Sequence, residues 1–146
     1  MPPQLYITTI QPGSEWYQQL LQLRTIVLLR PIGVDPSFIK PEAERNDILI
    51  GAFVEEKLVG GCVLTPRNAD TVQLRQMAVA PELQGKAIGK AILAFAEKTA
   101  MSHHFQTLML HARSPVVPFY EKSGYTITGE PFEEVGIQHY KMEKRL

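Results

Sequence analysis

The chain contains one cysteine in 146 residues, no excess of either charge and no long apolar run. The single cysteine, Cys62, excludes an internal disulfide and a cysteine-rich zinc site. The 15 basic and 15 acidic side chains balance, which argues against broad binding to nucleic acid or to anionic membranes. No apolar stretch reaches the roughly 18–20 residues of a membrane helix, and the start of the chain lacks the pattern of a secretory signal. We therefore expect a soluble, cytoplasmic protein without nucleic-acid or membrane partners.

The chain does contain enough apolar material for one core. Hydrophobic residues make up 45% of the sequence and charged residues 21%, and we find no repeat, linker or low-complexity tract. A chain of this length buries a sizeable core without disulfides or metals. The sequence therefore predicts one domain that spans residues 1–146.

Short apolar runs rich in β-branched residues predict a series of strands. The predicted strands are Leu5–Ile10, Ile48–Val54, Leu58–Leu64, Val72–Val79, Thr107–Ala112, Tyr125–Thr128 and Gln138–Met142. The second and third are separated only by residues 55–57, which favours an antiparallel hairpin.

Helical spacing of apolar residues predicts three helices between these strands. The first begins at Ser14, ends near Arg30 and should bury one stripe, formed by Trp16, Leu20, Leu23 and Val27. The second follows Pro81 and presents Ile88, Ile92, Phe95 and Ala96 on one face, and the third covers Val116–Lys122. The strand–helix–strand unit from Thr71 to Ala112 should place two strands parallel through a right-handed crossover. We therefore expect an α/β domain with a mixed sheet.

Residues 77–90, MAVAPELQGKAIGK, run from the end of a strand into the first turn of a helix. Gly85 and Gly89 leave the backbone open, and the first N–H groups of a helix have no partner within it, so this turn suits an anion. Lys86 and Lys90 carry positive charge at the helix end where the dipole disfavours it, which an anionic ligand would explain. A glycine-rich turn with solvated lysines is the alternative. The segment matches neither a P-loop nor a dinucleotide-binding fingerprint.

The same segment resembles the acetyl-CoA motif of the GNAT N-acetyltransferases. Gln84-x-x-Ala87-x-Gly89 follows Met77-Ala78-Val79-Ala80-Pro81, and Ala87 stands where the family usually has glycine. Because alanine is compatible with helical dihedral angles, we expect weaker cofactor binding at most.

A second segment resembles another conserved region of the same superfamily. Ala112-Arg113 is followed by residues 119–125, FYEKSGY, in the order and at the spacing of that family. Residues 23–33 and 132–139 resemble the small bacterial ElaA-like branch. The resemblance implies a GNAT domain, with a mostly antiparallel sheet that contains one splayed parallel strand pair and is flanked by helices.

The resemblance also implies how acetyl-CoA would be held. Backbone groups of Met77, Ala78 and Val79 would pair with the pantetheine arm as an added strand does, and an N–H group there would polarise the thioester carbonyl. The remaining implied cofactor contacts are Gln84, Gly85, Lys86, Ala87, Ile88, Gly89 and Lys90 around the pyrophosphate, together with Arg113 and Phe119.

Tyr120 aligns with the general acid that protonates the departing thiolate. A phenol has a reference pKa of about 10, so it is protonated at pH 7 and can donate; the alternative is a core aromatic residue. The general base is left open among His139, His111, Glu133 or Glu134, and the strand around Arg75. The two histidines and the two glutamates also fit purely structural or solvated roles.

Three further residues are candidates for the acceptor site. Glu133 suits a cationic amine, whereas Arg24 and Arg75 suit an anionic part of the acceptor. The sequence predicts direct acetyl transfer from acetyl-CoA to a primary amine of a small molecule, without a metal, in a protein that forms a homodimer as many relatives do. A CoA-binding sensor with little catalysis and a general phosphate- or nucleotide-binding domain are the alternatives.

Overall fold

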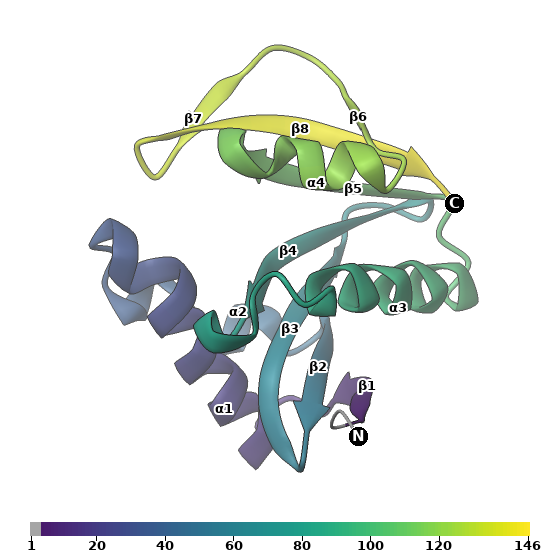
Figure 1. Cartoon of the computed structure of the whole chain (residues 1–146). Helices are drawn as coiled ribbons and strands as arrows, with labels where there is room; N and C mark the ends of the chain where they lie inside the picture. Colours follow the sequence, from purple (N-terminus) through teal and green to yellow (C-terminus); the bar gives the residue numbers. More distant parts are fainter. Residues whose placement is uncertain (1–3) are drawn as a thin grey trace.

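Eight strands form one sheet in the computed structural model of this protein, which describes residues 4–146 (Figure 1). The strands are β1 Leu5–Ile10, β2 Ile48–Val54, β3 Lys57–Pro66, β4 Thr71–Val79, β5 Thr107–Arg113, β6 Thr126–Ile127, β7 Phe132–Glu134 and β8 Ile137–Arg145. Their order is β1-β2-β3-β4-β5-β8-β6, with β7 paired to β8. All neighbouring strands are antiparallel except β4 and β5, so the predicted mixed sheet and its parallel pair are confirmed.

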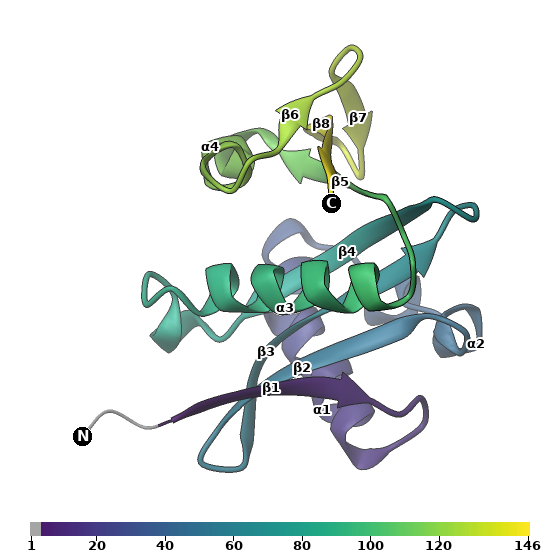
Figure 2. The same ribbon diagram turned by 90° about the vertical axis from the view of Figure 1, so that its right-hand side faces the viewer.

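Helices cover both faces of the sheet, with α3 on one side and α1 on the other (Figure 2). The α-helices are α1 Glu15–Arg24, α2 Pro41–Glu44, α3 Ile88–Ser102 and α4 Val117–Lys122. Beyond α1 the chain stays helical as a π-helical turn, Thr25–Leu29, and a 3-10 turn, Arg30–Ile32. Further 3-10 turns are Pro36–Phe38, Pro81–Leu83 and Ser114–Val116. The Ser14 hydroxyl accepts a hydrogen bond from the Tyr17 N–H (3.2 Å) and caps α1, as the sequence predicts.

Each strand predicted from the apolar pattern is present in the structure. The pattern missed β7, which has only three residues and is largely exposed. The predicted buried stripe of α1 is wrong at Trp16, whose side chain is 40% exposed and packs edge-on against Phe53 (ring centroids 5.0 Å apart). Tyr17, Leu20 and Arg24 are the residues that α1 buries. An arginine is buried here because a carboxylate from α2 neutralises it, which helical periodicity cannot show.

Two apolar clusters hold the layers together. The larger lies between the sheet and α3 and includes Ile92, Leu108 and Tyr120, and the smaller joins α1 to β1–β3 through Leu20 and its neighbours. Cys62 is fully buried in the larger cluster, and burial raises the pKa of its thiol to about 12, which agrees with its predicted role as a small core residue.

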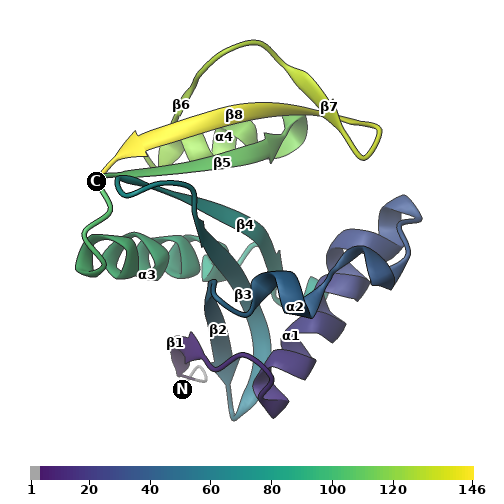
Figure 3. The ribbon, with the colours of Figure 1, turned by 180° about the vertical axis from the view of Figure 1, so that it is seen from behind.

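The parallel pair opens into a V along its length (Figure 3). β4 and β5 are paired only from Thr71 opposite Thr107 to Leu74 opposite Leu110. Beyond this point β4 remains paired with β3, and β5 remains paired with β8. The register between β3 and β4 shifts near Gln76, whose φ of +56° is unusual for a residue other than glycine. The splay implied by the family resemblance is therefore present, and it creates the space for the site described next.

Candidate active site

A cavity of about 430 Å³ occupies the opening between β4 and β5. Its walls come from these two strands, from the helical segment 27–38, from α4 and from the turn between β7 and β8. Eight of the residues predicted as functional line it: Arg75, Met77, His111, Arg113, Phe119, Tyr120, Glu134 and His139. A second cavity of about 580 Å³ lies beside β1 and is lined by none of the predicted site residues.

Tyr120 lies on α4 and lines the cavity. Its ring is buried and packs edge-on against Phe119 and Tyr125, with centroids 4.9 and 5.8 Å away. Burial raises the pKa of Tyr120 above its ordinary value of 10, so the phenol keeps its proton throughout the neutral range. Among residues 4–146 no group is hydrogen-bonded to the Tyr120 hydroxyl, which leaves that proton available to a molecule in the cavity.

A carboxylate lies between two histidines that line the same cavity. Glu134 Oε1 is 3.5 Å from His111 Nδ1, and Glu134 Oε2 is 3.6 Å from His139 Nε2. His139 Nδ1 is 2.8 Å from the Ile137 carbonyl oxygen, and since a carbonyl only accepts, this nitrogen carries the hydrogen. Neutral His139 therefore has its lone pair on Nε2, facing Glu134. This arrangement can take up a proton from an amine.

Strand pairing brings this group together. Glu134 ends β7, His139 lies opposite both Phe132 of β7 and Arg113 of β5, and His111 lies two residues before Arg113. The Phe132 ring is stacked on His139 (5.8 Å) and contacts His111 edge-on (4.9 Å), which restricts the orientation of both imidazoles. His111 of β5 thus joins Glu134 and His139, which lie more than twenty residues further along the chain, in one cluster.

Glu133 does not share this placement. It lies opposite Gln138, is exposed and does not line the cavity, because consecutive side chains of a strand point to opposite faces. The structure therefore does not bring Glu133 to the cavity, and Glu134 is the carboxylate that lines it.

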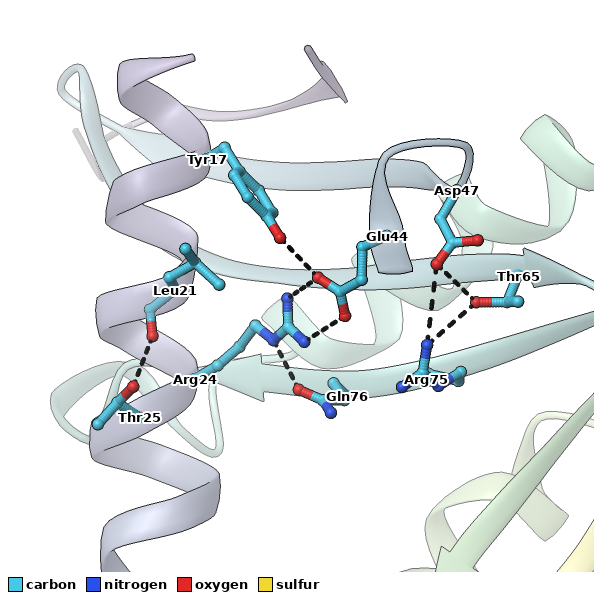
Figure 4. A network of polar contacts seen from close by, with 9 residues as sticks. All are labelled: Tyr17, Leu21, Arg24, Thr25, Glu44, Asp47, Thr65, Arg75 and Gln76. Carbon is cyan, nitrogen blue, oxygen red and sulfur yellow. Dashed lines mark hydrogen bonds and ion pairs between the residues drawn. The ribbon is translucent and has the colours of Figure 1, made fainter. Parts of the chain in front are cut away.

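Arg24 is also misassigned by the sequence, because its side chain is completely buried (Figure 4). Its two terminal nitrogens donate to Glu44 at 2.9 and 2.7 Å, and its Nε donates to Gln76 Oε1 at 2.6 Å. The Tyr17 hydroxyl donates to the same carboxylate (2.8 Å). Arg24 thus holds the side chain of Gln76, the residue at the irregular point of β4, and is not available to an acceptor.

Arg75 lines the cavity, and its side chain is 30% exposed. Its Nη1 donates to Thr65 Oγ1 (3.3 Å) and lies 3.8 Å from Asp47 Oδ2 (Figure 4). Arg113, a predicted cofactor contact, donates from Nη2 to the Leu28 carbonyl (3.3 Å) and so joins β5 to the helical wall. Both guanidinium groups add positive charge to the lining.

The backbone of β4 offers hydrogen-bonding groups to the opening. The Ala80 N–H donates to the Val59 carbonyl of β3 (2.7 Å), so alternation directs the backbone groups of Val79 away from β3. The Val79 carbonyl already accepts from Gln84 Nε2 (3.0 Å). Ala78 lies opposite Gly61 in the β3–β4 ladder, and its pairing with a ligand stays a prediction. Met77 lies at the shift in register between β3 and β4 and lines the cavity.

The turn before α3 presents a run of unpartnered N–H groups. Within the described chain, none of the amides of residues 85–90 donates to a protein acceptor, and no side chain caps α3. Gly85 (φ +81°) and Ala87 (φ +65°) are left-handed, a geometry that turns consecutive N–H groups toward one concave side. Lys86 and Lys90 are exposed, whereas the side chain of Ile88 is buried and contributes only backbone. A phosphate fits this turn.

Gly89 connects the turn to the cavity. A side-chain carbon added at Gly89 would lie 3.6 Å from the ring of Phe119, which itself lines the cavity. An elongated ligand can therefore reach from the turn to Tyr120.

The expectation that Ala87 adopts helical dihedral angles is wrong, since its φ of +65° and ψ of 13° place it in the left-handed region. The Cβ of an L-residue is strained there, at a cost of about 1–2 kcal/mol. Ala87→Gly should therefore raise the free energy of unfolding by about 0.5–1 kcal/mol, once the greater freedom of glycine in the unfolded chain is included. Urea denaturation measures this change.

Gly85→Ala is the matched control for Ala87→Gly. Gly85 has a similar φ and open space around the position of a Cβ, so the added methyl should lower stability by a similar amount through backbone strain alone. Stabilisation by Gly85→Ala, or destabilisation by Ala87→Gly, contradicts this account of the turn.

Several lining residues had no sequence signal. Gln76 reads as an ordinary strand residue, and the residues of the helical wall 27–38 show no pattern that points to a site. β7 also lacked a clear signal, because two of its three residues are glutamates and the turn Val135-Gly136 is not one of the favoured hairpin pairs such as Asn-Gly. Among the described residues, no group of three or more His, Cys, Asp or Glu side chains could hold a metal ion, and no helix is long and apolar enough to cross a membrane.

Comparison with known proteins places this site in a family. Residues 34–146 match the model of the acetyltransferase (GNAT) domain, and the chain belongs to this family. Streptothricin acetyltransferase of Escherichia coli is 26% identical over 91 residues, which are 60% of this chain and 52% of that protein. The chain therefore spans about half the length of that relative.

Solved structures share the fold over nearly the whole chain. The crystal structure of Escherichia coli ElaA has a TM-score of 0.83 at 20% identity, covering 97% of this chain and 100% of that one. An aminoglycoside 6'-N-acetyltransferase complexed with coenzyme A has a TM-score of 0.81 at 19% identity, covering 96% of both chains. The GNAT fold indicated by the sequence motifs is confirmed.

Proposed function

We propose that this protein transfers the acetyl group of acetyl-CoA to the primary amine of a small molecule by direct attack. The observation that carries this proposal is that Tyr120 and the cluster of His111, Glu134 and His139 face one cavity at the splay of β4 and β5. A proton donor and a proton acceptor in one cavity are what transfer between a thioester and an amine requires. The anion-binding turn at residues 85–90 adjoins the same opening.

The residues present fit acetyl-CoA. The unpartnered N–H groups of the turn suit its pyrophosphate, and Met77, at the edge of β4 that is not paired with β5, suits the amides of its pantetheine arm. Membership of the GNAT family and the coenzyme A complex of a structural neighbour support this assignment. When bound, acetyl-CoA supplies the activated acetyl group.

The proton transfers follow from the geometry of the chain. The carboxylate of Glu134 attracts the ammonium form of the acceptor, and His139 Nε2 accepts the proton that the amine must lose. The neutral amine then forms the new C–N bond at the acetyl carbon while an N–H of β4, such as that of Met77, stabilises the carbonyl oxygen. The C–S bond breaks, and the Tyr120 hydroxyl donates its proton to the departing thiolate. The nitrogen, now bonded to the acetyl carbon, loses its extra proton, which restores the Tyr120 hydroxyl and leaves a neutral amide.

Calorimetric titration with acetyl-CoA, with ATP as the comparison ligand, tests the cofactor half of this proposal. We expect binding in the micromolar range that favours acetyl-CoA, because the opening accommodates a pantetheine arm that ATP lacks. Gly89→Glu should weaken binding at least about tenfold, since its carboxylate lies against the anion site.

Ser102→Glu is the matched control, because it adds the same charge at the exposed far end of α3 and should leave affinity unchanged. Equal affinity for ATP would favour a general nucleotide-binding domain. The absence of acetyl-CoA binding would remove the acetyltransferase proposal.

A further inference from the structure

The mouth of the cavity is apolar and exposed. Phe38, Val116 and Val135 are 52%, 43% and 41% exposed, come from three separate segments of the chain and all line the cavity. Behind them the helical wall contributes Val27, Leu28, Leu29, Ile32 and Val34. Large apolar side chains that converge on a cavity and remain uncovered mark a surface that an apolar ligand covers.

The charge of the lining selects among amines. Glu134 is the one carboxylate among the residues of the described chain that line the cavity. Arg75 and Arg113 also line it, and Arg75 lies 3.8 Å from Asp47 Oδ2 outside the lining. A single ammonium group is accommodated beside Glu134, whereas the further ammonium groups of a polycationic molecule find no second carboxylate in the lining.

Val135 lies at this mouth in an unfavourable backbone conformation. Glu134 pairs with Ile137, so Val135 and Gly136 form a two-residue turn, with φ of +48° and +74°. Both residues of such a turn need positive φ, and asparagine is favoured at the first position, whereas a β-branched residue there is a true outlier. Strain of this kind concentrates at functional sites, which points to a use for the Val135 side chain.

We infer that the acceptor is a primary monoamine attached to an apolar aliphatic or aromatic body. Phe38, Val116 and Val135 cover that body, and Glu134 binds the ammonium group. This inference rests on the proposed function and adds to it the class of the substrate and a residue, Val135, that determines specificity.

Steady-state kinetics with three amines test the substrate class. The probes are 2-phenylethylamine, ethylamine and kanamycin, which are an apolar monoamine, a monoamine without a large body and a polycationic aminocyclitol. For the wild-type protein, kcat/KM for 2-phenylethylamine should exceed the values for the other two by at least about tenfold, because burial of the phenyl ring adds binding energy that they lack.

The Val135→Asn variant distinguishes the backbone strain at residue 135 from the apolar contact of its side chain with the acceptor. The change suits the turn and should raise Tm by about 2–4 °C. It should also lower kcat/KM for 2-phenylethylamine by about fivefold to tenfold through KM, because it removes apolar contact, while kcat/KM for ethylamine changes less than about twofold.

Glu55→Asn is the matched control. Glu55 and Glu56 form the two-residue turn between β2 and β3 with φ of +50° and +64°, and neither lines the candidate active site. The control should raise Tm to a similar extent and leave the kinetics for all three amines unchanged.

The outcomes distinguish the substrate class from the proposed reaction. Acetylation of kanamycin at least as efficiently as 2-phenylethylamine overturns the inference but leaves the acetyltransferase proposal standing. Equal losses for 2-phenylethylamine and ethylamine in Val135→Asn also overturn it. Acetyl-CoA binding without acetylation of any of the three amines overturns the substrate class, whereas failure to bind acetyl-CoA overturns the reaction as well.

Discussion

Replacement of Tyr120 with phenylalanine is expected to lower kcat for acetyl transfer by about 10²–10⁴-fold. The substitution removes only the hydroxyl, which has no protein partner among the described residues and faces the cavity. The ring contacts with Phe119 and Tyr125 persist, so the fold and the affinity for acetyl-CoA should be unchanged. Turnover of the preferred amine and calorimetry with acetyl-CoA measure the two effects separately.

Tyr125→Phe provides the comparison for this prediction. Its hydroxyl donates to Glu97 Oε2 (2.8 Å), and Tyr125 does not line the cavity, so its removal should cost about 1 kcal/mol of stability without loss of turnover. Equal losses of kcat in the two variants, or a Tyr120→Phe variant with more than half of the wild-type kcat, contradict the role of Tyr120 as general acid. A CoA-binding sensor would show no turnover in either the wild type or the variants.

The alkaline behaviour of kcat follows from the environment of Tyr120. Because burial raises its pKa above 10, the phenol stays protonated as the pH rises through the neutral and mildly alkaline range. Loss of the acid should therefore not limit kcat in that range, and any change there reports on other groups.

Replacement of Glu44 with glutamine is expected to lower the free energy of unfolding by about 3–5 kcal/mol. The wild-type carboxylate accepts two hydrogen bonds from Arg24 and one from Tyr17, in a region with almost no solvent access. The neutral amide leaves the guanidinium buried without a counter-charge, and that penalty far exceeds the worth of the lost contacts. Urea denaturation of the wild type and the variant measures it.

An exposed ion pair supplies the control for the buried one. Lys141 Nζ lies 3.3 Å from Glu143 Oε1, and both side chains are more than one third exposed, so Glu143→Gln should cost less than about 1 kcal/mol. If the two substitutions lower the free energy of unfolding by the same amount, the buried pair of Arg24 and Glu44 does not have the stabilising role assigned to it. Since Arg24 also orients Gln76, Glu44→Gln should loosen the irregular part of β4.

The dependence of this effect on pH has a definite sign. Burial by itself raises the pKa of Glu44, but the hydrogen bonds and charge of Arg24 and the Tyr17 hydroxyl outweigh it and hold the pKa below its ordinary value of 4.5. A lowered pKa in the folded state means that the stabilisation is complete above the unfolded pKa and is lost as the pH falls through the folded one. The difference in stability between the wild type and Glu44→Gln should therefore shrink in acid below about pH 4.5.

Local sequence alone determined much of the fold. Apolar alternation located seven of the eight strands, and the order of strands and helices was sufficient for the parallel β4–β5 pair. The two motifs, residues 77–90 and 119–125, were sufficient for the family. These features succeed because strand periodicity, turn residues and backbone anion sites depend on residues that are close along the chain.

Tertiary structure decided which of the candidate side chains face the site. Arg24 is buried because Glu44, twenty residues away, neutralises it, and Glu134 rather than Glu133 enters the cavity because pairing with β8 sets the face of β7. His111 and His139 meet on either side of Glu134 because β5 and β8 are neighbours in the sheet. Sequence periodicity specifies a residue's position along its own element, whereas burial and charge pairing depend on the elements packed against it.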